Sequence, residues 1–211
     1  MFKTGLIIGA HREELAFGEK TANRIKKKGI DVIRIADGIP NRRAHGELKS
    51  SKKTDLDNLY SRIHRKVCGK YDLVIDLHSG LSEKWSADIF SSGMDFLDFL
   101  DAGLKKIFRD KFHLPDEIRL FKIIRNNQSK PNAFDDRFPI CLAFVPEDIV
   151  NGKHYRYVGL EVYLTSQEGC SADYRLSQQL ILAVHECAMR LYLPESASRG
   201  TQSVPGRPVS T

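Results

Sequence analysis

The fold is decided by GLIIGA at residues 5–10 and by HREE, which follows directly at residues 11–14. A short apolar run of this kind predicts a buried strand. A helix is predicted over residues 13–28, because its basic last turn is followed by Gly29, a residue favoured just past helix ends. A second strand is predicted over residues 31–36. Strand, helix and strand in this order indicate a parallel βαβ unit.

The rest of the chain continues the alternation of strands and helices. Residues 40–53 are polar and basic without periodicity, and we predict a loop there. Strands are predicted over 71–77, 117–124, 140–145 and 157–164, and helices over 94–112, from a cap at Thr54, and from a cap at Ser171 to residue 191. The pattern predicts an α/β fold, a single domain with a central, mostly parallel or mixed sheet and helices on both faces.

Length and composition fit one globular domain. The chain has 211 residues, 41% of them hydrophobic and 28% charged. These values exclude a mostly disordered chain, a collagen-like repeat and a bundle of membrane helices. We expect the folded domain to cover residues 1–193. Residues 194–211 have little to bury and are predicted to be a disordered tail.

Charge and cysteine spacing narrow the expected partners and compartment. The net charge is +6, but acidic residues are interleaved with the 33 Lys and Arg residues nearly everywhere. Nucleic-acid binding is therefore not expected as the main function. The four cysteines show no C-x-x-C spacing, which suits a reducing compartment. No run is long enough for a membrane span or a signal-peptide core, so the sequence predicts a cytoplasmic protein without membrane contact.

Three polar residues that follow the predicted strands have the character of a metal site. His11 and Glu14 form an H-x-x-E pair in a strand-to-helix turn, and residues three apart on such a turn project to one side. His78 follows the strand predicted over 71–77. Ligands bind at the carboxyl ends of strands in α/β sheets, and two histidines with one glutamate form a catalytic zinc set. Taken separately, each feature also fits a structural residue at a helix start or strand end.

At four places the sequence resembles the zinc carboxypeptidase superfamily, and within it the succinylglutamate desuccinylase and aspartoacylase branch. The matching motifs are GAHREE at 9–14, NR at 41–42, DLHS at 76–79 and GLEVY at 159–163. The resemblance spans roughly residues 5–190 in order of motifs. It implies one zinc ion per chain held by His11, Glu14 and His78. It also implies Glu161 as general base and Asn41 with Arg42 as the pair that holds the substrate.

The chain departs from the family pattern at several points. Arg12 and Glu13 stand where the family often has Gly and Asn, and the chain has no room for the β-rich domain that the aspartoacylase branch often carries. The pair at 41–42 lacks the usual acidic lead-in, so Arg43 is an alternative to Arg42. The DLHS motif is also similar to that of the N-formylglutamate amidohydrolases, a related group of zinc amidases.

Glu161 has two interpretations. In the strand predicted over 157–164 the alternation places it opposite the apolar Val158, Leu160, Val162 and Leu164. It therefore faces either solvent or, if both faces of the sheet are covered, a pocket. We favour the pocket, where Glu161 would act as a general base.

Together these observations predict a zinc-dependent hydrolase of an amide bond next to a free carboxylate, such as an N-acyl amino acid deacylase or a carboxypeptidase-like enzyme. The expected partner is a small carboxylate-bearing substrate, because the planar guanidinium of Arg42 or Arg43 binds a carboxylate in two-pronged fashion. Three alternatives remain at this stage: a non-catalytic anion- or nucleic-acid-binding protein, an amidase like the N-formylglutamate amidohydrolases, and a metal-binding relative without catalysis.

Overall fold

The computed structural model describes residues 2–25, 29–40, 50–109, 117–124, 137–142, 145–150 and 154–192. Seven strands occur in these residues: β1 (Thr4–Ile8), β2 (Ile30–Arg34), β3 (Leu73–Leu81), β4 (Ser86–Ser91), β5 (Glu117–Ile124), β6 (Ile140–Leu142) and β7 (Arg156–Leu164). The helical elements are η1 (Arg12–Glu14), α1 (Leu15–Ile25), α2 (Ser50–Val67), α3 (Met94–Arg109), α4 (Glu147–Val150) and α5 (Ser171–Tyr192).

The strands form one mixed sheet in the order β2-β1-β3-β7-β4-β5-β6. The four strands β2, β1, β3 and β7 run parallel, and β4, β5 and β6 are parallel to one another. The two groups meet at the antiparallel pair of β7 and β4. The predicted α/β fold with a mostly parallel or mixed sheet is therefore confirmed.

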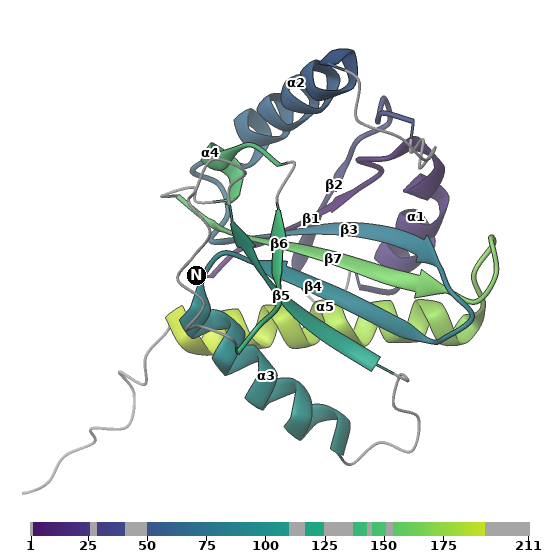
Figure 1. Ribbon diagram of the computed structural model, residues 1–211, viewed down its shortest axis with the longest axis vertical. Helices are drawn as coiled ribbons and strands as arrows, with labels where there is room; N and C mark the ends of the chain where they lie inside the picture. Colours follow the sequence, from purple (N-terminus) through teal and green to yellow (C-terminus); the bar gives the residue numbers. More distant parts are fainter. Residues whose placement is uncertain are drawn as a thin grey trace, which may run out of the picture.

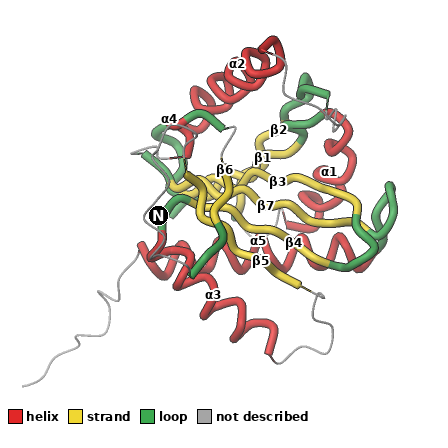
Figure 2. Tube along the Cα trace, viewed as in Figure 1, coloured by secondary structure: helices red, strands yellow, loops and turns green. Residues whose placement is uncertain are grey.

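Helices cover both faces of the sheet, as predicted (Figures 1 and 2). The core on one face joins apolar side chains of α1, α3 and α5 to the sheet, among them Phe17, Phe96 and Leu180. The core on the other face joins α2 and α4 to the sheet, with Ile63 and Ile149. Full burial of each such side chain stabilises the fold by roughly 1.5–3 kcal/mol.

Several predicted boundaries are wrong. α2 already begins at Ser50, inside the predicted loop 40–53, so Thr54 is not its cap. β3 continues to Leu81, so His78 lies within the strand rather than after it. The first turn of α2 is polar, and the end of β3 consists mainly of small and polar residues. Neither segment shows a periodic pattern of apolar residues, so the sequence predicted both elements too short. Ser171 is the first residue of α5, and the side chain of Asp173 caps the start by accepting a bond from the Cys170 N–H at 2.7 Å.

Two elements were missed, β4 and the single turn α4. β4 has the sequence SADIFS and buries Ser86, Asp88 and Ser91 together with Ala87 and Ile89. Buried polar residues hide a strand from a reading based on hydrophobicity. The ends predicted at residues 26–28, 110–112 and 143–144, and the tail at 194–211, lie outside the described residues, so the domain boundary stays a prediction.

No helix in the described part of the chain is long and apolar enough to cross a membrane.

Candidate metal centre

The first two candidate ligands lie in the turn that joins β1 to α1. His11 has an extended backbone, and the Glu14 N–H donates to the His11 carbonyl at 3.1 Å, which closes one 3-10 turn. This turn brings the buried Glu14 side chain to the same side as His11. Gly9 allows the sharp exit from β1, because its φ is +80° and a Cβ there would lie 2.8 Å from the Ile35 carbonyl oxygen.

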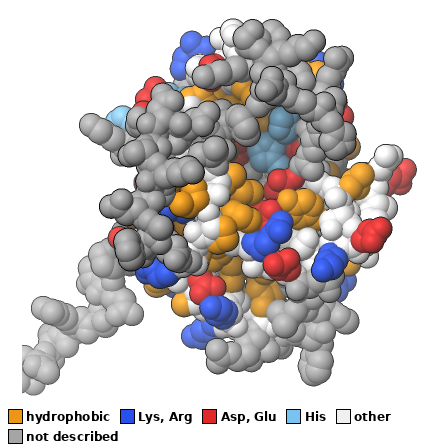
Figure 3. Space-filling view, viewed as in Figure 1, with side chains coloured by type: hydrophobic (Ala, Val, Ile, Leu, Met, Phe, Trp, Pro, Cys, Tyr) orange, Lys and Arg blue, Asp and Glu red, His pale blue; other side chains and the backbone are white. Residues whose placement is uncertain are grey.

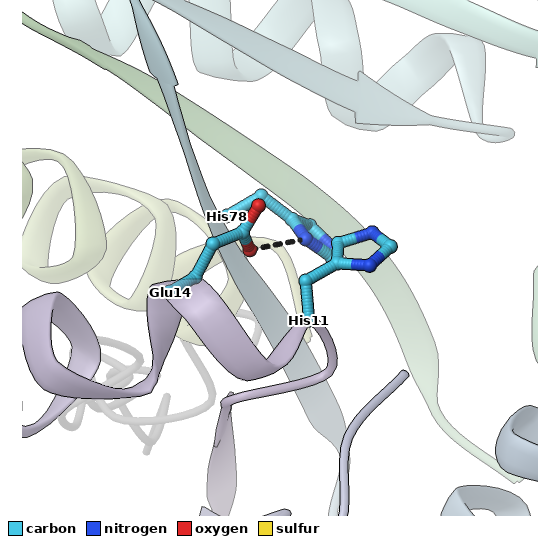
Figure 4. Close-up of side chains that lie close together, drawn as sticks. All are labelled: His11, Glu14 and His78. Carbon is cyan, nitrogen blue, oxygen red and sulfur yellow. Dashed lines mark hydrogen bonds and ion pairs between the residues drawn. The ribbon is translucent and has the colours of Figure 1, made fainter. Parts of the chain in front are cut away.

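His78 reaches the same place from the adjacent strand β3. Its Nδ1 lies 3.0 Å from Glu14 Oε2 (Figure 4). One ligand atom from each of His11, Glu14 and His78 can be chosen so that all three lie within 4.8 Å of one another. The structure thus brings together the three residues that the sequence predicted, although His78 lies 64 positions after Glu14 in the chain.

A buried carboxylate holds the far side of the His78 ring. Asp76 Oδ2 lies 3.2 Å from His78 Nε2 and accepts hydrogen bonds from the hydroxyls of Tyr60 at 3.0 Å and Tyr157 at 2.8 Å. Asp76 has no exposed surface. A carboxylate on the second ring nitrogen is the usual partner of a metal-binding histidine, because it fixes the tautomer and the orientation of the ring.

The charges of the cluster are set by this surrounding. Burial opposes protonation of His78, but the carboxylates of Asp76 and Glu14 outweigh it and hold the His78 pKa well above its ordinary value. Burial also favours a neutral Asp76, yet His78 and the two tyrosine hydroxyls keep the Asp76 pKa below its ordinary value. Burial, and then the neighbouring His78, lower the pKa of His11. His11 is therefore neutral near pH 7.

The donor set fits a zinc ion. His11 Nδ1 is buried and has no hydrogen-bond partner among the described residues, and a buried polar atom of this kind calls for a partner. Two imidazole nitrogens and one carboxylate are ligands that zinc accepts, with a further position left for water or substrate. In the space-filling view, histidine side chains lie in a hollow, with acidic and then basic side chains on the surface beside it (Figure 3).

Glu161 lies next to the cluster on β7. It pairs with His78 in the register of the parallel strands β3 and β7, so both side chains leave the sheet on the same face. Val158, Leu160 and Val162 of the same strand point to the other face of the sheet, into the core formed with α1, α3 and α5, as the alternation predicted. Gly80 makes room beside it, because a Cβ there would lie 2.9 Å from Glu161 Oε1 and 2.9 Å from the Tyr163 ring.

Further polar residues on this face were missed by the sequence reading. Asp88 of β4 pairs with Glu161 on one side and with Arg119 of β5 on the other. Tyr163 donates to Asp88 at 2.8 Å. The alternation of polar and apolar residues in SADIFS was the available signal for β4, but the pairing of β4 with β7 is a long-range contact that no local pattern shows.

Asn41, Arg42 and Arg43 lie outside the described residues. The chain that leads to them is described: the Ile39 N–H donates to the Ala10 carbonyl at 3.1 Å, and the Arg12 N–H donates to the Ile39 carbonyl at 2.9 Å. Ile39 therefore lies beside His11, two positions before Asn41.

Comparisons with known proteins give structural likenesses alone. No protein-family model matches the chain, and the search of curated proteins found no match. The structure is similar to the N-acetylmuramoyl-L-alanine amidase AmiC2 of Nostoc punctiforme, with 9% identity and a TM-score of 0.42 over 90% of this chain and 96% of that one. It is also similar to the CwlD amidase from Clostridioides difficile, solved in complex with the GerS lipoprotein, with 14% identity and a TM-score of 0.46 over 90% and 98% of the two chains. Zinc-free YNDL has 10% identity and a TM-score of 0.40 over 92% of this chain and 87% of its own. At these identities the likenesses identify no family, and the fold is established by this chain's own sheet and helices.

Proposed function

We propose that the protein is a zinc-dependent hydrolase of an amide bond next to a free carboxylate, with His11, Glu14 and His78 as the zinc ligands. The observation that carries this proposal is the convergence of three ligand atoms within 4.8 Å. The buried Asp76 behind His78 supports it, because it orients the ring as a metal-binding histidine requires.

Glu161 is the proposed general base. It pairs with His78 on the same face of the sheet and is not among the three residues whose ligand atoms converge, so its proposed role is to act on a water molecule rather than to bind the ion. A bound zinc ion supplies a Lewis acid that lowers the pKa of water and polarises the carbonyl oxygen of the substrate. The Glu161 carboxylate takes the proton from the attacking water and passes it to the nitrogen of the leaving amine.

Asn41 and Arg42, with Arg43 as the alternative to Arg42, are proposed to hold the substrate carboxylate. Support comes from Ile39, whose backbone pairs with that of Ala10 and Arg12 and so brings the chain to the metal centre just before residue 41. A guanidinium there would bind both oxygens of a carboxylate at once.

The substrate class that the resemblance implies is a small N-acyl amino acid or a short peptide. The zinc carboxypeptidase superfamily, and its succinylglutamate desuccinylase and aspartoacylase branch, remain the proposed relatives. An amidase like the N-formylglutamate amidohydrolases is the alternative, and it would be recognised by activity on N-formyl but not on larger N-acyl groups. A reducing, cytoplasmic location also stays a prediction.

Metal content tests the first part of the proposal. Protein purified without chelator should contain about one zinc ion per chain by elemental analysis. His78→Ala should lose the metal, whereas His154→Ala, which changes an exposed histidine outside the cluster, should keep it. Purified wild-type protein without stoichiometric metal would overturn the proposal.

Kinetics test the role of Glu161. With an N-acyl amino acid that the zinc-loaded protein hydrolyses, Glu161→Gln should lower kcat by about 10²–10⁴-fold while zinc content stays the same. Glu168→Gln, on the exposed loop after β7, is the matched control and should leave kcat unchanged. An unimpaired Glu161→Gln enzyme would remove Glu161 from the mechanism.

A further inference from the structure

Four ionisable side chains stand in one row across four strands of the sheet. His78 on β3 pairs with Glu161 on β7, Glu161 pairs with Asp88 on β4, and Asp88 pairs with Arg119 on β5. Paired positions on neighbouring strands project from the same face. The row therefore leads from the metal centre, past the proposed base, to a guanidinium group.

Arg119 is held by a carboxylate that the fold buries. Its Nε donates to Asp88 Oδ1 at 2.7 Å and its Nη2 to Asp88 Oδ2 at 2.8 Å. Tyr163 donates to the same Oδ2 at 2.8 Å, and the guanidinium lies 5.6 Å from the centre of the Phe121 ring. Because Asp88 belongs to the strand between β5 and β7, these bonds draw the guanidinium of Arg119 toward Glu161.

The burial of Asp88 distinguishes this pair from an ordinary surface ion pair. The side chain of Asp88 is 5% exposed, whereas that of Arg119 is 43% exposed. A second arginine, Arg34, makes the same two-pronged contact with Glu19 at similar exposure, but Glu19 is 33% exposed. Burying a carboxylate is costly unless it is fully bonded. The buried Asp88 carboxylate therefore needs both hydrogen bonds from Arg119. These bonds hold the guanidinium in one orientation at the edge of the proposed active site.

Among the described residues, the only side chain that accepts hydrogen bonds from the Arg119 guanidinium is Asp88. An arginine has five N–H donors, and Asp88 occupies two of them on the Nε side. The three that remain lie on Nη1 and Nη2 and form a fork that matches a second carboxylate. Because the Arg119 side chain is already fixed by Asp88, which Tyr163 holds in turn, little further rotamer freedom is lost when a ligand binds.

We propose that Arg119 binds a carboxylate group of the substrate, on the side of Glu161 that faces away from the metal centre. This inference rests on the proposed hydrolase function and adds a specificity residue that the sequence motifs do not contain. Neighbouring strands are about 4.8 Å apart, and β4 is the second strand from β3, so it lies roughly 10 Å away. The Arg119 guanidinium is bonded to Asp88 of this strand. The group bound by Arg119 is thus a second carboxylate, several bonds from the amide that is cleaved, and it is distinct from the carboxylate next to that amide, which Asn41 and Arg42 are proposed to hold.

A series of ω-mercaptoalkanoic acids tests this proposal on the zinc-loaded protein. The thiolate binds zinc, and the carboxylate reaches toward β5 when the chain is long enough. Each acid is compared with the amide of the same length by isothermal titration calorimetry. At the length that spans the two groups, we expect the acid to bind about 10–100-fold more tightly than the amide, as a charged, two-pronged hydrogen bond allows.

Variants assign this preference to a residue. Arg119→Gln and Arg119→Lys should reduce the acid-to-amide ratio to near one, while Arg34→Gln should leave it at the wild-type value. Arg119→Lys keeps a positive charge next to Asp88, so it guards against a simple failure to fold. A ratio that persists in both folded Arg119 variants, or that falls equally in Arg34→Gln, would overturn the proposal.

An experiment on metal-free protein distinguishes an error in the proposed Arg119 site from an error in the proposed zinc site. If neither the acids nor the amides bind, the proposed zinc centre is wrong, and Arg119 is then tested alone by titrating glutarate into chelator-treated protein. The ¹⁵Nε resonance of Arg119 should shift saturably with glutarate, and that of Arg34 should not. Equal responses of both arginines, or the same response to inorganic phosphate, would show unspecific anion binding and refute the carboxylate site.

Discussion

Asp76 is a buried carboxylate whose surroundings explain its position. A charge of this kind is tolerated inside a protein only when hydrogen bonds replace the lost water. Oδ2 has three such partners, namely His78 and the hydroxyls of Tyr60 and Tyr157. The tyrosines come from α2 and β7, so the carboxylate is fixed from two sides and in turn fixes the ring of His78.

Replacing Asp76 by Asn should therefore weaken zinc binding without removing a ligand. The amide oxygen still accepts one bond, but the negative charge that raises the basicity of His78 is lost. We expect the zinc dissociation constant to rise about 10–100-fold, as found for carboxylates behind metal-binding histidines. Competition with a chromophoric chelator measures the change, and Asp55→Asn on the exposed face of α2 is the control. Equal affinities of the two variants would show that Asp76 has only a structural role.

Gly80 controls the place of the proposed base. A Cβ at this position would meet both the Glu161 carboxylate and the Tyr163 ring at 2.9 Å, so one of them must move in Gly80→Ala. A displacement of about 1 Å at a catalytic group costs up to about 100-fold in rate. We expect a lower kcat with unchanged zinc content.

The matched control is Gly159→Ala on β7, because a Cβ there would meet nothing closer than Phe90 at 3.5 Å. Its kcat should stay close to that of the wild type. If Gly80→Ala is as active as Gly159→Ala, the carboxylate of Glu161 does not depend on the space over Gly80.

The cluster of His11, Glu14 and His78 was predictable from sequence, and the row of Glu161, Asp88 and Arg119 was not, for a physical reason. His11 and Glu14 follow a short apolar run, His78 follows the largely apolar residues 71–77, and parallel strands bring their carboxyl ends to one edge. Asp88 and Arg119 become neighbours of Glu161 only through the register of β7, β4 and β5. Such pairings join distant segments, and local periodicity contains no information about them.

At the scale of elements, α5 shows which features a sequence determines well. Its apolar residues recur with helical spacing, and Leu176, Leu180, Ile181 and Val184 are all fully buried against the sheet. β4 shows the opposite case. Strand direction reverses between β7 and β4, and no strand was predicted over residues 86–91, where Asp88 is buried.

His185 ties α5 to the first strand and gives the fold a pH dependence. Its Nδ1 lies 2.7 Å from Thr4 Oγ1, and burial lowers the pKa of His185 below its ordinary value, an effect that Glu186 opposes. The unfolded chain, with an ordinary histidine pKa near 6.5, therefore takes up a proton at a higher pH than the folded protein does. The contribution of His185 to the free energy of unfolding therefore decreases as the pH falls below about 6.5, with a slope of at most about 1.4 kcal/mol per pH unit.

His185→Asn should remove this contribution, because Asn can still bond to Thr4 but does not titrate. Urea unfolding of chelator-treated protein at pH 7.5, 6.5 and 5.5 measures the effect. The wild type should lose more stability than the variant between pH 6.5 and 5.5, and the two should change in parallel above pH 7. Parallel curves over the whole range would show that the environment of His185 does not perturb its titration.

At the scale of the whole molecule, the candidate metal centre brings together residues that are linked to different cores of the fold. His11 and Glu14 precede α1, which packs in the core of α1, α3 and α5, whereas Asp76 behind His78 is bonded to Tyr60 in the core of α2 and α4. An ion at this position would therefore connect the two faces of the sheet. Its ligands are assembled only in the folded chain, so zinc binding should stabilise folding.

Removal of the metal should consequently lower the thermal midpoint. A ligand that binds only the folded state stabilises it by about 2.7 kcal/mol at a concentration one hundred times its dissociation constant. In a domain of this size about 1 kcal/mol corresponds to roughly 2–4 °C, so EDTA should lower the Tm by about 5–10 °C, and added zinc should restore it. His78→Ala, which lacks a ligand, should have the same Tm with and without EDTA, while His154→Ala should respond as the wild type does. Differential scanning calorimetry at several free zinc concentrations provides the measurement, because a true site makes the Tm rise with the logarithm of free zinc. A wild-type Tm that ignores both EDTA and zinc would mean that His11, Glu14 and His78 form a hydrogen-bonded structural cluster rather than a metal centre.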